Sequence, residues 1–265
     1  MDFIAACKEI YSFFFRHNLK SKRTKVLFLL SSVPVLVLLV TKIVELGNPG
    51  SDVSAEKVFS RVLLVIYFQL LIPVLALLFG TLIVNEEIDH KTLIFLTTSP
   101  IPKPSIIVGK YAAFVTLSVI IIHSGLLLCF IIININHLGA MSYVSEFLSF
   151  MGVGILALFA YMALFTLMGT LMKKALVLGL MFIFGWENIV QYIPGTTQKF
   201  TVSHYLKSLL NDNSSSNSIL SFLMSKLEPS STVESITVLL LLMIVSLVGA
   251  SYVFQNKEYV ISDAA

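Results

Sequence analysis

Charged residues are scarce in this 265-residue sequence, in which Asp, Glu, Lys and Arg make up 12%. Ordinary soluble domains carry about 25% charged residues, whereas hydrophobic residues here reach 57% and the mean hydropathy is +0.91. This balance excludes a water-soluble fold. Cysteine is scarce too. Cys7 and Cys129 stand far apart in the sequence, which excludes a disulfide framework and the close spacing of a cysteine metal site.

Long apolar runs dominate what remains, and six of them are long enough to cross a bilayer as helices, which takes about 20 residues each. They cover residues 26–44, 62–84, 111–133, 147–171, 175–193 and 236–254. Lys and Arg resist translocation, and most of them fall on the cytoplasmic side if both chain ends are placed in the cytoplasm. The sequence therefore predicts an all-α integral membrane protein with six transmembrane helices and an N-in, C-in topology.

The first 25 residues predict an amphipathic helix at the inner membrane surface. Apolar residues recur at three- and four-residue spacing from Phe3 to Phe15, opposite Glu9 and Arg16. A basic run at residues 20–25 follows, and it would face anionic lipid headgroups. The alternative for the same pattern is an ordinary cytoplasmic helix that packs on protein.

We expect one transmembrane domain over residues 1–265. Its parts are the amphipathic helix and basic run (1–25), five spans (26–193) that include a cytoplasmic coupling loop (85–110), an outer loop (194–234), and the sixth span with a short cytoplasmic tail (235–265). The outer loop is rich in Ser and Asn and contains Pro and Gly, which predicts an outer cap with a flexible middle.

The loop between the second and third runs has an ordered pattern of acidic residues, an apolar patch and prolines. The acidic residues are Glu86, Glu87 and Asp89. Leu93 and Leu96 can share one side of a short helix, which Pro100 would end. Such a helix below the bilayer is suited to docking a cytoplasmic partner. The alternative for the acidic residues is a solvated helix start whose charge suits the helix dipole.

This loop resembles that of the membrane subunits of type-2 ABC transporters, in which an acidic pair precedes Gly-Thr-Leu, a Ser/Thr-Pro-Ile/Leu step and Gly-Lys. The matching residues are Glu87, Asp89, Thr92, Leu93, Leu96, Ser99, Pro100, Ile101, Gly109 and Lys110. Lys91 stands where the family has the glycine before Thr, so the backbone there is expected to differ.

The resemblance implies a permease subunit of an ATP-driven exporter in the cell membrane. Its coupling helix would contact a separate ATPase subunit, and a second copy or a paralogous permease would complete the pathway. The implied contact residues are Glu86, Glu87, Asp89, Thr92, Leu93, Leu96, Ser99 and Pro100. The sequence has no Walker-type Gly-x-x-x-x-Gly-Lys-Ser/Thr. We therefore expect no enzyme activity, no bound cofactor and no nucleic acid on this chain, with ATP and Mg²⁺ on the partner.

Polar residues within the apolar runs are candidates for a pathway or an outer vestibule, because a charge at the bilayer centre costs about 2.5 to 3.5 kcal/mol on insertion scales. These candidates are Gln69, His123, Glu187 and Asn188. The alternative for Glu187 is a solvated carboxylate at a helix end, and the alternative for His123 is a hydrogen-bonded packing residue.

Two other classes of protein share this span count. A secondary transporter or channel usually places an ion-coupling carboxylate near the midplane, and Glu187, the candidate acid, is off-centre in its run. An intramembrane serine protease needs a serine and a histidine on neighbouring helices, but the stretch around His123 lacks the Gly-x-Ser-Gly pattern. The order of residues in the second loop favours the ABC permease.

Overall fold

Helices make up all the regular structure in the computed structural model, which describes residues 2–47, 62–89, 101–134, 141–172, 174–190, 196–211 and 230–257. Five of the helices in this part of the chain are long and apolar enough to cross a membrane. They are α2 (Lys22–Gly47), η1 with α4 (Val62–Leu71 and Ile72–Asp89), α6 (Lys103–Ile133), α7 (Met141–Leu171) and α12 (Thr232–Asn256). The predicted all-α class is confirmed.

The predicted fifth span, residues 175–193, is a shorter apolar helix in the structure. Its described part, Ala175–Val190, falls below the about 20 residues that a span needs. It consists of α8 (Ala175–Met181), the π-helical η2 (Phe182–Glu187) and α9 (Asn188–Val190). The Asn188 side-chain amide donates to the Ile183 carbonyl, at 2.9 Å, and so adds a side-chain bond within this segment. The described residues thus supply five candidate spans.

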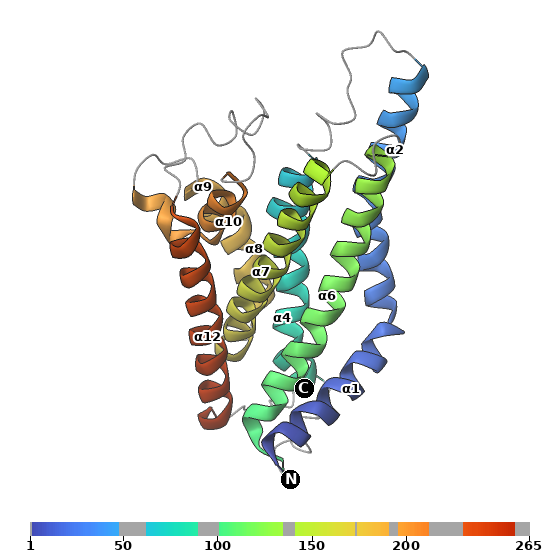
Figure 1. Cartoon of the computed structure of the whole chain (residues 1–265). Helices are drawn as coiled ribbons and strands as arrows, with labels where there is room; N and C mark the ends of the chain where they lie inside the picture. Colours follow the sequence, from blue (N-terminus) through green and yellow to red (C-terminus); the bar gives the residue numbers. More distant parts are fainter. Residues whose placement is uncertain are drawn as a thin grey trace.

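The long helices form one bundle in which α4 packs mainly on α7, α7 packs on α12, and α6 packs on α1 (Phe3–Leu19) and α2. Figure 1 shows α1, the start of α6 and the final turns of α12 at the same end of the bundle. At this end the Lys257 ammonium donates to the Thr170 and Leu171 carbonyls, at 2.8 and 2.7 Å. Lys257 thereby satisfies carbonyls that the end of α7 leaves without helical partners.

The α4–α7 contact depends on glycines that let the two backbones approach closely. A Cβ on Gly80 would lie 2.9 Å from the Phe165 Cβ and 3.0 Å from the Met162 carbonyl oxygen, and one on Gly169 would lie 3.2 Å from the Thr81 Cα. Small residues at helix contacts are the usual solution in membranes, where lipid is as apolar as leucine and packing drives association. The centre of the bundle is built on this close pair.

The predicted N-terminal segment forms a helix, α1. Ala6 and Ile10 are buried against the bundle, whereas Phe3, Ile4 and Phe13 are exposed. The helix therefore packs on protein along one side, as the alternative reading of its pattern proposed, and keeps apolar side chains on its outer side. Those side chains are suited to a membrane surface.

Part of the predicted outer loop is folded. Residues 196–211 form η3 (Thr196–Phe200) and α10 (Val202–Asn211) at the end of the bundle opposite α1. The helix α10 packs on α7 and α12. Its buried residues recur at helical spacing, and they are Val202, Tyr205, Leu206, Leu209 and Leu210. The Ser- and Asn-rich middle of the loop lies outside the described residues.

Candidate functional site

The end of α4 carries a buried ion pair. The Lys110 ammonium on α6 donates to Glu87 at 2.6 Å and to the Ile83 carbonyl at 3.0 Å. Lys110 is 0% exposed and Glu87 is 8% exposed. Desolvating two charges is expensive, and their attraction offsets the cost only where geometry is good and further hydrogen bonds are made. The short bond and the additional carbonyl meet this condition.

Helix α1 covers the same pair. The Lys110 ammonium lies 4.4 Å from the centre of the Phe14 ring, within reach of a cation–π interaction. Ile10 lies one turn before Phe14 on α1. A Cβ on Gly109 would lie 2.8 Å from the Ile10 Cγ2, so glycine is needed at this position for α1 to approach α6. The Gly109-Lys110 step of the family motif therefore joins α1, α4 and α6 at one point.

The neighbouring acid, Glu86, faces outward. Its carboxylate accepts a hydrogen bond from Arg23 at the start of α2, at 2.9 Å, and both side chains are partly exposed. An exposed pair of this kind contributes about 0 to 1 kcal/mol. Successive acidic residues therefore have different roles: Glu87 bonds inward to α6, and Glu86 lies on the surface beside the basic start of α2.

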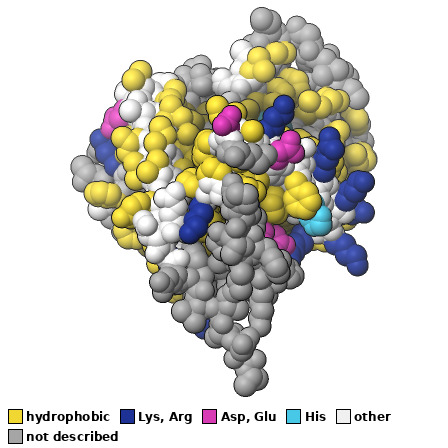
Figure 2. Space-filling view, turned by 90° about the horizontal axis from the view of Figure 1, so that it is seen from below, with side chains coloured by type: hydrophobic (Ala, Val, Ile, Leu, Met, Phe, Trp, Pro, Cys, Tyr) yellow, Lys and Arg dark blue, Asp and Glu magenta, His cyan; other side chains and the backbone are white. Residues whose placement is uncertain are grey.

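Basic side chains gather at this end of the molecule. Figure 2, which views the bundle from this end, shows Lys and Arg side chains along one edge of the face. The exposed basic residues of α1 and the start of α2 are Lys8, Arg16, Lys20, Lys22, Arg23 and Lys25. Such a cluster beside an amphipathic helix suits anionic headgroups.

The predicted coupling residues are only partly described. Glu86, Glu87 and Asp89 lie in the last turn of α4, and the contacts of the Asp89 side chain are outside the description. Thr92, Leu93, Leu96, Ser99 and Pro100 fall outside the described residues. The structure does place the helices that flank this segment, because Glu87 in the last turn of α4 is bonded to Lys110 of α6. The end of α4 is thus held to the first part of α6.

A second polar cluster lies at the opposite end of the bundle, around Glu187. This carboxylate accepts hydrogen bonds from the Tyr161 hydroxyl at 3.1 Å, from the Ser203 hydroxyl at 2.5 Å, and from the backbone N–H groups of Val202 and Ser203 at 3.0 and 3.1 Å. Glu187 is 3% exposed, so its interpretation as a solvated helix end is wrong. It instead caps the first turn of α10, where N–H groups lack helical partners and a negative charge is favoured.

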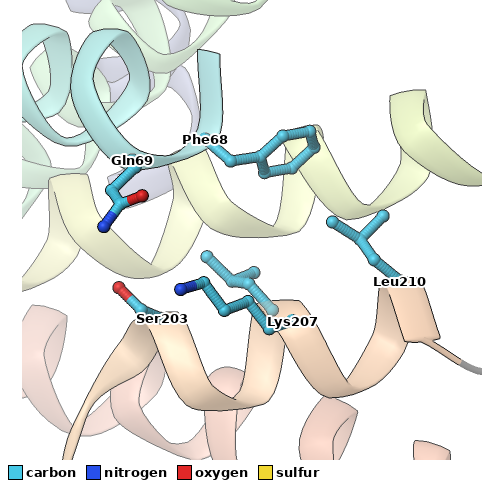
Figure 3. A pocket seen from close by; sticks show the side chains of 6 residues that line it. Phe68, Gln69, Ser203, Lys207 and Leu210 are labelled. Carbon is cyan, nitrogen blue, oxygen red and sulfur yellow. The ribbon is translucent and has the colours of Figure 1, made fainter. Parts of the chain in front are cut away.

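Two more of the predicted vestibule residues meet beside this cap. The Gln69 amide donates to the Asn188 side-chain oxygen at 2.7 Å. Gln69, Ser203 and Lys207 border a small cavity of about 10 Å³, and Figure 3 shows the Lys207 ammonium directed toward Gln69 and Ser203. This is room for about one water molecule among polar groups. Burial lowers the pKa of Lys207, and the nearby Glu187 carboxylate opposes that shift.

His123 does not join this cluster. Its ring nitrogens lie 3.0 Å from the Val119 and Met151 carbonyl oxygens, which matches the alternative of a hydrogen-bonded packing residue. The contacts of His123 connect α6 with α7. Of the predicted pathway residues, the structure therefore brings together Gln69, Glu187 and Asn188 and leaves His123 apart.

The sequence alone did not single out three members of the second cluster, Tyr161, Ser203 and Lys207. Tyr161 lies in an apolar run, where a tyrosine signals little by itself. Ser203 lies in the first turn of α10, and the apolar spacing from Val202 to Leu210 predicts a helix that needs a cap. That spacing was the available signal.

The fold and these clusters can be set beside known proteins. The family model described as ABC-2 family transporter protein matches residues 6–259. The chain belongs to the ABC-2 transporter family. This match confirms the resemblance seen in the second loop, and it makes the chain a multi-pass membrane protein and a transport component of the permease kind. No curated protein matches the chain.

Proposed function

We propose that this ABC-2 permease is the membrane half of an ATP-driven exporter. It pairs with a second copy or a paralogous permease and is driven by a separate ATPase subunit that binds ATP and Mg²⁺. Residues 90–100 dock on that subunit, and the sidedness is N-in and C-in in the cell membrane, with Ala175–Val190 as the fifth of six crossings. The observation that carries the proposal is the buried Glu87–Lys110 pair.

That pair supports coupling for a mechanical reason. A loop transmits a push to the bundle only if its ends are held by rigid elements. Glu87 holds the end of α4 to α6 through a bond of 2.6 Å, and Phe14 adds α1 to the same point. Movement of the loop by a partner subunit would then shift α1, α4 and α6 together. Such a joint shift would let ATP binding on the partner favour one of two conformations of the bundle.

The second cluster argues against an ion-coupled transporter. A coupling carboxylate must exchange a proton or cation during transport. Glu187 is instead occupied by four donors, two of which are backbone N–H groups of α10. Releasing it would leave the start of α10 uncapped. Its arrangement supports a structural role at the outer end, where η3 and α10 cover the bundle.

The docking role of residues 90–100 predicts a specific loss of partner binding. Leu93→Asp or Leu96→Asp should abolish copurification of the ATPase subunit from mildly solubilised membranes, because each puts an unpaired charge into an apolar contact. Membrane insertion should be unchanged. Leu93→Met, which preserves volume and polarity, is the matched control and should copurify normally. Normal ATPase association in both Asp variants would refute the docking assignment.

A further inference from the structure

A groove of about 260 Å³ opens between α7 and α12 at the α10 end of the bundle. Gly152, Val153 and Leu156 of α7 form one wall, Ile236 of α12 forms the other, and Leu209 of α10 closes the end. For comparison, an apolar cavity of about 150 Å³ accommodates one benzene ring. The groove is thus large enough for a segment of an apolar chain.

Gly152 lines the groove and contributes no side chain to it. A Cβ at this position would have nothing within 4 Å, whereas one on Gly169 of the same helix would lie 3.2 Å from the Thr81 Cα. Glycine weakens the interior of a helix relative to alanine, and at Gly169 close packing explains it. At Gly152 no contact among the described residues does so. The missing side chain leaves space.

The walls select an apolar occupant. Besides its aliphatic side chains, the groove is bordered by Ser149 and Thr232. The Ser149 hydroxyl donates to the Ser145 carbonyl of its own helix, at 3.1 Å. A ligand in the groove would therefore have to compete with this carbonyl for the hydroxyl proton. A polar ligand would lose its hydration without gaining adequate partners. An apolar ligand would restore the dispersion contacts that the open space lacks.

The surface of α12 connects the groove to the bilayer. Exposed apolar side chains recur every four residues along this helix, and they are Ile236, Leu240, Ile244, Val248 and Tyr252. A helix has about 3.6 residues per turn, so each step of four moves the position by about 40° and the row winds gradually around the helix. The row starts at the wall of the groove and follows a membrane-spanning helix, so lipid chains that surround the row also reach the groove.

The size of the groove distinguishes a lipid chain from a second copy of the protein. A helix with its side chains is about 10–12 Å across, too wide to enter a gap between two helices that are themselves packed together. An acyl chain is no wider than one aliphatic side chain. We infer that the groove between α7 and α12 binds one acyl chain of a membrane lipid. This inference depends on α7 and α12 spanning the membrane and is independent of the ATPase partner and the transport direction.

Photo-cross-linking tests this inference directly. The purified protein is placed in phosphatidylcholine nanodiscs that contain phosphatidylcholine with a diazirine midway along one acyl chain, and labelled peptides are mapped by mass spectrometry. We expect residues 149–156 to be labelled more strongly than the lipid-exposed row at Leu240–Val248. Gly152→Phe, which fills the groove, should remove this excess and leave labelling of the row unchanged.

The control variant is Ile244→Phe, which adds the same ring to the exposed row and leaves the groove open, so the excess labelling should persist. If Gly152→Phe does not purify as a folded protein, Gly152→Leu is the smaller plug, and the wild-type map is decisive without either variant. Groove labelling no stronger than that of the row would overturn the inference. So would a disulfide between two copies of Gly152→Cys, because a second chain would then occupy the groove.

Discussion

At the scale of single residues, two ionisable side chains buried in this bundle, Lys110 and Glu87, are bonded to each other. Lys110 belongs to the Gly-Lys step in which the sequence resembles the family, and Glu87 belongs to the acidic stretch for which that resemblance implies an ATPase contact. Their 2.6 Å bond joins residues that are 23 positions apart. No spacing rule predicts it, because the partner is on a different helix whose rotation depends on packing.

Breaking the buried pair should lower the stability of the protein strongly, and replacing the second partner as well should restore most of it. Lys110→Met removes one partner of a buried pair, which costs about 3–5 kcal/mol. The double variant Lys110→Met with Glu87→Leu should recover most of that loss, since apolar replacement of a whole pair is often neutral. Thermal unfolding in one detergent measures both variants.

The exposed pair supplies the control for that experiment. Arg23→Met breaks a surface bond to Glu86 at 2.9 Å and should change stability by less than about 1 kcal/mol. If Lys110→Met were as mild as Arg23→Met, or if the double variant were no better than Lys110→Met alone, the pair would not hold α4 and α6 together.

Glu187 gives a second residue-scale prediction, concerning the cap on α10. Glu187→Gln replaces one acceptor oxygen by an NH₂ group that faces donors, and each buried group left unsatisfied costs about 1–3 kcal/mol. We expect α10 to loosen, which limited proteolysis near residues 202–211 would detect. Glu234→Gln is the matched control, because the Glu234 carboxylate is exposed and lies 3.9 Å from Lys199. Equal protease resistance of the two variants would contradict the capping role.

At the scale of elements, the apolar runs predicted most of the fold. Five of the six predicted runs lie within helices long enough to span a membrane, because length and apolarity alone define such a helix. The run at 175–193 differs because Glu187 and Asn188 bond sideways to α10 and η1. Hydropathy does not contain that information. The apolar spacing of α10 is typical of a helix, but the surrounding sequence is rich in Ser and Asn, and the whole segment was therefore predicted to be a loop.

The packing of α10 on the start of α12 predicts a response to acid. Burial lowers the pKa of His204 from its usual 6.5; Lys199 adds to this shift and Glu234 opposes it. Below about pH 6.5 the unfolded state therefore binds more protons than the folded state, so stability falls as the pH decreases. The His204 Nε2 atom lies 3.0 Å from the Ser230 hydroxyl, while the buried Nδ1 has no partner among the described residues.

The fluorescence of Trp186 should follow this response to acid. It is the one tryptophan in the sequence, and its indole N–H donates to the Phe200 carbonyl just before α10, at 3.3 Å. Acidification from about pH 8 to about pH 5, the range in which histidine gains its charge, should shift the Trp186 emission to longer wavelength. His204→Gln should abolish the shift, and His17→Gln, at the exposed end of α1, should not. A shift that persists in His204→Gln would assign the response to another group.

At the scale of the whole molecule, the two ends of the bundle differ in chemistry. One end has the exposed basic residues of α1 and α2, the Glu87–Lys110 pair, the end of α4 and the start of α6. The other has η3, α10 and the capped Glu187. The structure places these groups at opposite ends, in agreement with the charge distribution in the sequence. Which end faces the cytoplasm follows from the tendency of Lys and Arg to stay inside.

Cysteine labelling in intact cells tests this orientation. In a background with Cys7→Ser and Cys129→Ala, Ser214→Cys should react with a membrane-impermeant maleimide added outside, because it lies in the segment that joins α10 to α12. His90→Cys follows α4 at the basic end and should react only after the cells are opened. Both variants should label equally in opened cells, which controls for accessibility. Labelling of His90→Cys from outside, with protection of Ser214→Cys, would invert the topology and put the loop at residues 90–100 out of reach of a cytoplasmic ATPase.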